Sequence, residues 1–427
     1  MLILPLLLLL TTPSYPKPLL VLDPSMGRAG VIPCQDDNLV SCVLAQVDVS
    51  AFDDNVLLLP NGVELAKQNY IQEPRHRSGI VEEVTSIVYS NRGVEAIFSY
   101  RGDRVMGNIK DVNGTDFALE PCNNFIGCHV WKEEEKVKTL TMGDRSASNR
   151  ELGTKVALTE KMKKLVQKGK ADDTTVVEFS IRFYYTKGFA KATSDVTLFF
   201  NQVLAVTNQG FSNSKIPVKA KIFCIEATTL TDQAEADDLR KNFEKLKGSG
   251  VAGRRAVLGT ADAAALFVVK TNQAGIGQHR GWDSSNSLSV NMKKHSFTAF
   301  IFGHEIGHNF GCEHDPKTEP KNKYYSYGYG SLINPKYLTI MGYPSGKYEK
   351  VINYYSNPKV LFNGVATGTK TQDNTRVIKE NRFAMAAVGD ESGTCSTMST
   401  TSSTTATTTS LVTEDGEGQF TEDFEGY

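Results

Sequence analysis

The first third of the chain consists of short runs in which apolar and polar residues alternate. Examples are Ile80–Tyr89, Val94–Tyr100 and Val105–Ile109, and Gly, Asn and Asp residues separate the runs. A period of two residues buries one face of a β-strand, and Gly and Asn adopt the backbone conformations of tight turns. The pattern therefore predicts a mainly antiparallel β domain over residues 15–135.

The pattern changes after residue 173, where apolar runs of strand length alternate with segments of helical periodicity. This order predicts an α/β domain over residues 174–393. A strand at Ser287–Asn291 is expected at the edge of its sheet, where it pairs with an extended substrate. The other elements are expected at Val176–Tyr185, Thr193–Asn208, Val218–Ile225, Glu235–Lys247, Ala264–Val269 and Phe297–Phe310.

Three segments lack the apolar positions that a core requires. Residues 136–173 are polar, with five lysines between Lys161 and Lys170, and predict a solvated linker that is cleaved during activation. Residues 396–410 contain thirteen Ser and Thr residues and predict a disordered, O-glycosylated segment. Leu411–Tyr427 carries six carboxylates and predicts a solvated acidic tail, so residues 394–427 are expected to form no domain.

The first residues indicate the compartment. Leu2–Leu10 is an apolar run that small residues follow, which is typical of a signal peptide over residues 1–14. The run is too short to span a bilayer, and no later stretch approaches the roughly 20 apolar residues of a membrane helix. We therefore expect a secreted protein, and Asn113-Gly114-Thr115 offers a site for an N-glycan.

Composition narrows the class of protein. Of the 427 residues, 40% are apolar, which suffices for two or three domains with cores of their own. The net charge of −1 gives no indication of nucleic-acid binding. Four of the seven histidines are expected to be surface residues or satisfied polar residues, namely His76, His129, His279 and His295.

The other three histidines belong to residues 304–315, which read His-Glu-Ile-Gly-His-Asn-Phe-Gly-Cys-Glu-His-Asp. On a helix, His304 and His308 leave the same face one turn apart and can occupy two corners of a zinc tetrahedron. Gly311 is expected to end the helix, because glycine adopts positive φ, and to bring His314 back as the third ligand. Three protein ligands leave the fourth position open, which indicates one catalytic Zn²⁺ ion rather than a structural one.

A carboxylate accompanies these ligands. Glu305 follows the first histidine directly and is placed to act on a water molecule as the general base of peptide hydrolysis. Gly303 and Gly307 lie one turn apart in the same helix, at a cost of about 1 kcal/mol each relative to alanine. We expect another backbone to pack closely against them.

The extended motif resembles that of the metzincin zinc metalloproteases, and Asp315 is typical of their reprolysin-like (adamalysin-type) branch. Residues 354–358 are similar to a substrate-pocket segment of bacterial secreted relatives. The resemblance implies an α/β metzincin domain, in which a mixed twisted sheet and a zinc helix precede a small C-terminal subdomain. It also implies that the β domain is a propeptide and that the protein is a zymogen. Asp315 is expected to accept hydrogen bonds that support the site.

Two downstream residues fit the same resemblance. Metzincins carry a tight turn with a methionine beneath the zinc, and Met341 lies where that turn should fall. Its thioether would pack under the imidazoles and hold their geometry. Tyr343 matches the position at which astacin- and serralysin-like relatives place a tyrosine near the metal. It either donates to a developing oxyanion or forms a wall of the pocket.

Seven cysteines fit an oxidising compartment, but the number is odd. Two pairs could each close a short loop, Cys34 with Cys42 and Cys122 with Cys128, whereas the connectivity of Cys224, Cys312 and Cys395 is left open. An unpaired thiol suggests a cysteine that binds the zinc in the zymogen, and we favour Cys122 or Cys128. The alternative is that these two pair and that the propeptide blocks the cleft sterically.

Two other functions are weighed against a protease. A catalytically silent protease fold could serve as a binding protein, although such proteins usually lack one of the residues that are intact here. A non-peptidase zinc hydrolase is disfavoured because the Gly311 turn and Met341 occur together. We predict a monomeric zinc metalloendopeptidase that acts on protein or peptide substrates, with no nucleic acid partner and no insertion into membranes.

Overall fold

The computed structural model describes residues 20–22, 42–59, 63–72, 84–91, 93–111, 115–122, 128–133, 159–283, 286–294, 296–297, 299–320, 324–343, 349–390 and 395. The expected signal peptide, the sequon at Asn113 and the tail after Cys395 lie outside the described residues. The contacts of the chain place the described residues, from Leu20 to Cys395, in one compact unit.

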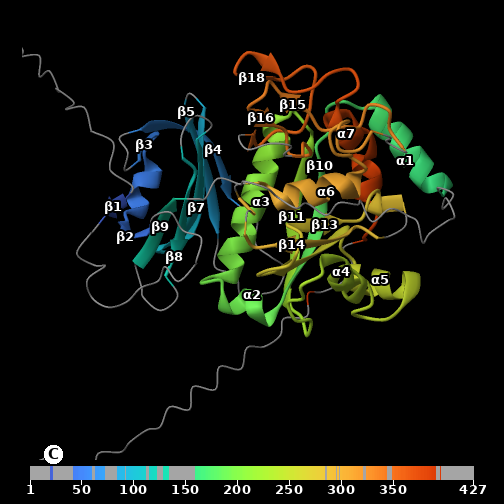
Figure 1. The fold of residues 1–427 in the computed structure, drawn as a ribbon, viewed down its shortest axis with the longest axis horizontal. Coiled ribbons are helices and arrows are strands. Elements are labelled where there is room, and N and C mark those ends of the chain that lie inside the picture. The colour runs from blue at the N-terminus through green and yellow to red at the C-terminus, as the bar shows by residue number, and fades with distance from the viewer. Residues whose placement is uncertain are drawn as a thin grey trace, which may run out of the picture. The chain divides into compact units, whose positions relative to one another are not determined.

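An antiparallel sheet of nine strands forms the N-terminal part, as predicted (Figure 1). Its strand order is β1-β2-β9-β8-β7-β6-β5-β4-β3, so most strands pair with their neighbours in sequence. A short 3₁₀ helix, Val49–Asp53, connects β2 to β3. The strands are β1 Leu20–Leu22, β2 Cys42–Val47, β3 Val56–Leu58, β4 Glu64–Gln72, β5 Thr85–Asn91, β6 Val94–Arg101, β7 Arg104–Asp111, β8 Phe117–Pro121 and β9 Cys128–Glu133.

A mixed sheet of five strands forms the centre of the second part and confirms the predicted α/β class. Its order is β11-β10-β12-β14-β13, in which β13 is antiparallel and the others are parallel. The expectation that Ser287–Asn291 forms the edge is wrong, because β14 lies between β12 and β13. The strands are β10 Val177–Tyr185, β11 Val218–Ala227, β12 Ala263–Val268, β13 Gly275–Gly277 and β14 Leu288–Met292.

Helices pack against this sheet. The longest helix, α3, is capped by Asp195, whose side chain accepts a hydrogen bond from the Leu198 amide. Helix α6, which carries the first two histidines of the motif, begins at Ile301 rather than at Phe297, because Phe300 adopts a left-handed conformation with φ 55°. The helices of this part are α2 Lys187–Lys191, α3 Val196–Asn213, α4 Ala236–Glu244, α5 Gly250–Leu258, α6 Ile301–Phe310 and α7 Asn374–Met385, with a 3₁₀ turn at Gly281–Asp283.

A further helix, α1 (Glu160–Ala171), lies in the segment that was predicted to be a solvated linker. It packs against α7, and a Cβ atom at Gly169 would lie under 3.0 Å from the Glu380 carbonyl oxygen. The fully buried Arg382 side chain donates to the carbonyl groups of Gly169 and Asp172 and so fixes the end of α1. The last part of the expected linker is therefore docked on the α/β domain.

Short strands and α7 form the part that follows α6. β15 and β16 pair antiparallel, β16 and β17 pair parallel, and β18 and β19 form a hairpin. These strands are β15 Leu332–Ile333, β16 Tyr337–Leu338, β17 Lys350–Val351, β18 Leu361–Phe362 and β19 Val365–Ala366. Among the helices that the structure describes, none has both the length and the apolar composition to cross a membrane.

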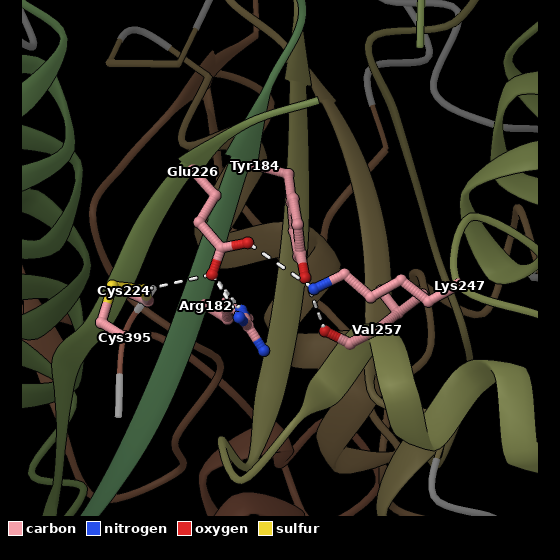
Figure 2. Close-up of a disulfide and its surroundings, with 7 residues drawn as sticks. All are labelled: Arg182, Tyr184, Cys224, Glu226, Lys247, Val257 and Cys395. Carbon is pink, nitrogen blue, oxygen red and sulfur yellow. Dashed lines mark hydrogen bonds and ion pairs between the residues drawn. A yellow bond between two sulfur atoms is a disulfide. The ribbon is translucent and has the colours of Figure 1, made fainter. Parts of the chain in front are cut away.

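One disulfide closes this part of the chain. Cys224 on β11 pairs with Cys395, which lies after α7 (Figure 2). Beside it, the Glu226 carboxylate forms ion pairs with Arg182 and with Lys247. The connectivity that the sequence left open is thus settled for these two cysteines, and Cys312 is a free, buried thiol.

Candidate metal centre and active site

Three imidazoles meet beside α6. His304 and His308 leave the same face of the helix, and Gly311, with φ 106°, ends it so that the chain returns His314 to them. The three Nε2 atoms lie 3.1–3.2 Å apart, and each residue is at most 3% exposed. The structure therefore brings together the three histidines that the sequence predicted as metal ligands.

The hydrogen bonds of His304 and His308 determine which ring nitrogen carries the proton. Nδ1 of His304 donates to the Ile340 carbonyl at 2.8 Å, and Nδ1 of His308 donates to the Cys312 carbonyl at 2.9 Å. In the neutral rings the Nε2 atoms of these two residues then carry lone pairs that face each other at 3.2 Å. Such a pair is repulsive unless a cation lies between the nitrogens.

A zinc ion fits this donor set. Zinc–nitrogen bonds of about 2.0–2.1 Å in a tetrahedron place two ligand nitrogens about 3.3 Å apart. Imidazole nitrogens are among the ligands that zinc prefers, and three protein ligands leave one corner for substrate or water. The triad thus suits a catalytic metal, consistent with zinc.

Burial keeps the imidazoles neutral, as metal binding requires. Desolvation lowers the pKa of His304 to about 3, and the neighbouring His308 adds to this effect. Desolvation likewise lowers the pKa of His308 to about 4, and it holds the pKa of His314 well below its usual range. At neutral pH, protons therefore do not compete with a metal for these nitrogens.

Glu305 lies on the neighbouring face of α6, against the edge strand β13. A Cβ atom at Gly277 would lie 2.9 Å from Oε2 of Glu305 and 2.7 Å from its carbonyl oxygen, and a Cβ atom at Gly275 would come closer than 3.0 Å to Oε1. The carboxylate is 2% exposed, and burial raises its pKa well above the usual range although the Gly277 backbone hydrogen bond lowers it. Two glycines thus leave the space that Glu305 occupies.

Met341 is fully buried beneath the zinc helix, where the tight turn was expected. A Cβ atom at Gly307 would lie under 3.0 Å from its sulfur, so this glycine lets the thioether reach the helix. Tyr355 lies beside it and donates a hydrogen bond from its hydroxyl to the Gly303 carbonyl at 2.7 Å. The close approach that Gly303 and Gly307 predicted is therefore made by two side chains and not by another backbone.

Asp315, the last residue of the motif, is hydrogen-bonded to the turn that contains Met341. One carboxylate oxygen accepts from the amides of Lys317 and Thr318, and the other accepts from the Tyr343 amide at 3.0 Å. The ring of Tyr343 packs edge-on against His314, with ring centroids 5.3 Å apart. Asp315 thus accepts the kind of supporting hydrogen bonds that the sequence indicated.

Residues 177–356 match the model of metallo-peptidase family M12 (Reprolysin_5). This part of the chain belongs to family M12.

Curated relatives of this M12 domain come from bacteria. A peptidyl-Asp metalloendopeptidase of Stenotrophomonas maltophilia is 28% identical over 193 residues, which cover 43% of this chain and 46% of the relative. A peptidyl-Asp metalloendopeptidase of Xanthomonas campestris pv. campestris is 27% identical over 192 residues, which cover 43% and 45%. The chain therefore spans about half the length of the curated relatives that it matches.

A solved structure is also similar to this chain. The crystal structure of metalloproteinase-II from Bacteroides fragilis matches with a TM-score of 0.37 and 10% identity, over 70% of this chain and 86% of the other. A likeness of this size carries no argument about function.

The structure places one further histidine beside the M12 triad. His279 is buried, its Nε2 atom lies 3.0 Å from Oε1 of Glu313, and its ring centroid lies 6.2 Å from that of His308. Burial raises the pKa of Glu313, but the nearby His279 outweighs this effect and the net result is a lowered pKa. The expectation of a surface or satisfied polar residue is wrong for His279, because its buried Nδ1 atom has no hydrogen-bond partner among the described residues. Its place next to the three histidines of the motif is not visible in the sequence.

The cysteines correct one expectation about latency. Cys122 is disulfide-bonded, so its thiolate is not free to bind the metal. Among the cysteines that the structure describes, the unpaired thiol is Cys312, which lies inside the motif and whose pKa burial raises well above the usual range. The side chain of Cys128 lies outside the described residues. The expected switch is therefore wrong for Cys122.

Proposed function

We propose that this protein is a secreted zinc-dependent endopeptidase that is made as a zymogen. The observation that carries the proposal is the convergence of three buried imidazole nitrogens next to the buried Glu305 carboxylate. Membership of family M12 supports the reaction class. The complete set of ligands and base argues against a silent protease fold that only binds other proteins.

The catalytic steps follow from the positions of these side chains. A zinc ion held by His304, His308 and His314 would polarise the scissile carbonyl and lower the pKa of the attacking water. Glu305 accepts the proton of that water and passes it to the leaving amine. Burial raises the pKa of the Glu305 carboxyl, which makes it a stronger proton acceptor than an exposed glutamate.

We infer that Tyr343 borders the substrate, because its ring packs on the ligand His314. If its hydroxyl donates to the oxyanion, Tyr343→Phe lowers kcat by about 100-fold with little change in KM. If the ring only forms a wall of the pocket, kcat stays near its original value. The two roles are thus separated by steady-state kinetics of one variant.

Secretion and latency complete the proposal. The apolar Leu2–Leu10 run supports export, and the Cys224–Cys395 disulfide fits an oxidising compartment. The N-terminal sheet is proposed as the propeptide, with activating cleavage between Lys136 and Asp173. Equal turnover by the uncleaved and the cleaved protein would contradict latency without affecting the proposed chemistry.

The test of the activity is Glu305→Ala. Casein hydrolysis should fall by about 10²–10⁴-fold, while zinc content, measured by inductively coupled plasma mass spectrometry, stays at one ion per chain. Glu178→Ala, which removes an exposed glutamate on β10, is the matched control and should keep full activity. Near-normal hydrolysis by Glu305→Ala, or hydrolysis that a zinc chelator leaves intact, would refute the assignment.

The substrate preference is a separate question. The two relatives are named as peptidyl-Asp metalloendopeptidases, so we propose aspartate as the first residue to test at the cleavage site. Mass-spectrometric profiling of a peptide library measures this preference directly. Cleavage sites without enrichment of aspartate would rule it out while leaving the endopeptidase assignment in place.

A further inference from the structure

Helix α3 is covered on every side. Residues 198–211 are buried without interruption, whereas a helix that packs on one sheet leaves a polar face in water. α3 contacts β11 of the α/β domain, and it also contacts β5, β6 and β7 of the N-terminal sheet. Two sheets therefore share this helix.

The apolar contacts cross from one part to the other. Val88, Ile97 and Met106, on three successive strands of the N-terminal sheet, belong to the same buried cluster as Phe199 of α3 and Phe302 of the zinc helix. Their sequence neighbours Ile87, Phe98 and Val105 belong to a separate cluster inside the N-terminal part. Because side chains alternate along a strand, the sheet has two apolar faces, and one of them packs against the core of the protease domain.

Buried polar side chains form hydrogen bonds across the same interface. The Gln202 side-chain amide of α3, which is fully buried, donates to the Ile97 carbonyl at 2.8 Å and to Oδ1 of Asn108 at 2.7 Å. The Glu95 carboxylate of β6 accepts hydrogen bonds from the side chains of Asn213 and Asn353, at 2.9 and 3.1 Å. Separation of the two parts would leave these groups without their partners.

Charged groups lie at the margin of the interface. The hairpin turn between β6 and β7 presents Arg101 and Arg104, which bind Oδ2 of Asp195 at 2.8 and 2.9 Å. The other oxygen of Asp195 accepts from the Leu198 amide at the start of α3. Arg104 also donates to the Ser194 carbonyl. The hairpin thus holds the N-terminus of α3.

From these contacts we propose that the N-terminal sheet is a lasting non-covalent partner of the protease domain. After the connecting chain is cut, the sheet stays bound to α3, because its departure would expose the apolar face of α3 and remove the partners of the Gln202 amide and of Oδ2 of Asp195. The hydrogen bonds and ion pairs described above involve α3, the two residues before it and Asn353, and not the metal ligands. Activation by cleavage must then act through the connecting chain and not through loss of the sheet.

A disulfide does not hold the two parts together. Cys224 pairs with Cys395 and Cys312 is free, so the bonded Cys122 must pair within the N-terminal part. Association after cleavage therefore measures the non-covalent interface. It is also independent of catalysis, so its failure would not affect the proposed activity.

The experiment uses the full chain with Glu305→Ala, to prevent self-cleavage, and with the recognition sequence of a site-specific protease inserted between residues 136 and 158. After cutting, the two fragments should elute as one 1:1 species in size-exclusion chromatography, with the composition confirmed by mass spectrometry. Separate elution, with a C-terminal fragment that keeps its near-ultraviolet circular dichroism, would overturn the proposal.

Two variants test whether this interface is responsible. Gln202→Ala removes the buried amide, and Arg101→Ala with Arg104→Ala removes the charged hairpin from the sheet side, so that α3 stays unchanged. Each should weaken association of the cut fragments by about tenfold or more in analytical ultracentrifugation. Lys163→Ala, in an exposed ion pair on α1, is the control and should have no effect. Unchanged association in both interface variants would overturn the proposal.

Discussion

A Cβ atom at Gly275 would lie under 3.0 Å from Oε1 of Glu305, so glycine leaves the space that this carboxylate occupies. The neighbouring Gly277 provides the same clearance for Oε2 and for the helix backbone. Strand β13 thus forms the edge of the sheet and also packs against Glu305, the proposed general base. A three-residue strand with two glycines buries few side chains, and its value here lies in the space that it leaves open.

Gly275→Ala should displace the Glu305 carboxylate by the width of a methyl group. Because a shift of about 1 Å in a catalytic group can cost about 100-fold in rate, we expect kcat to fall by that order while KM and zinc content change little. Gly303→Ala is the matched control, because its Cβ atom would meet Tyr355 at an ordinary 3.5 Å. Wild-type kcat in Gly275→Ala would show that the carboxylate does not depend on this space.

The metal ligands could be predicted from the sequence because their geometry is local. His304 and His308 are one helical turn apart, and the φ of 106° at Gly311 is a conformation that glycine adopts readily. The edge strand could not be predicted in the same way. Gly275–Gly277 contains one apolar residue and no alternation, whereas the longer run at Ser287–Asn291 has the pattern of a strand and is therefore favoured as the edge.

Long-range packing explains the other differences. Residues 160–171 have a polar composition typical of a linker, but the few apolar residues Met162, Leu165 and Val166 pack against the core of the α/β domain. The second sheet on α3 is likewise set by contacts between residues about 100 positions apart, such as Gln202 with Ile97. Neither contact leaves a periodic signal in the sequence.

The buried Glu305 carboxyl should make the metal-free protein sensitive to pH. Its usual pKa is 4.5, and burial raises the pKa well above this value in the fold. The contribution to stability is therefore complete below pH 4.5 and is lost as pH rises through the folded pKa, by up to about 1.4 kcal/mol per pH unit. Glu305→Gln removes this loss, so it should be more stable than the wild type above pH 4.5.

Urea unfolding of the metal-free wild type and Glu305→Gln at several pH values tests this directly. The difference in unfolding free energy should grow with pH and vanish near pH 4.5. A constant difference across the range would show that the carboxyl is not desolvated in the fold. Glu305→Gln should also be inactive, because it lacks the proposed general base. The wild-type carboxyl would then lower stability but be needed for activity.

His279 should be needed to keep Glu313 buried. The side chains of the pair are only 4% and 6% exposed, so His279→Ala leaves an uncompensated buried carboxylate. We expect a loss of about 3–5 kcal/mol in unfolding free energy at neutral pH. The net lowered pKa of Glu313 gives the sign of the pH effect, because its contribution is present above pH 4.5 and is lost as pH falls through the folded value.

Denaturant unfolding at pH 7 and at pH 4 measures both effects. Lys163→Ala, which breaks the exposed pair with Glu160, is the control and should change neither value measurably. An unchanged unfolding free energy of His279→Ala at pH 7 would show that Glu313 does not depend on His279, because another group or water then binds its carboxylate. The zinc content should be measured in parallel, because Glu313 precedes the ligand His314 directly.

Gly169→Ala should undock α1, although helix propensity alone predicts the opposite. Alanine in place of glycine stabilises a helix interior by about 1 kcal/mol. Here the added Cβ atom would lie under 3.0 Å from the backbone oxygen of Glu380, which cannot move without shifting α7. Lys170→Ala, one residue further along the same helix and exposed, is the matched control. Only the glycine variant should therefore separate α1 from α7.

Limited digestion with trypsin reports the docking, because α1 carries five lysines between Lys161 and Lys170. The wild type and Lys170→Ala should resist cleavage within α1, whereas Gly169→Ala should be cut there. It follows that activating cleavage falls between Lys136 and Thr159, ahead of the docked helix, and that the N-terminus of the cleaved form precedes Glu160. Resistance of Gly169→Ala to trypsin, or an N-terminus found inside α1 in the active form, would show that α1 is not held as part of the mature domain.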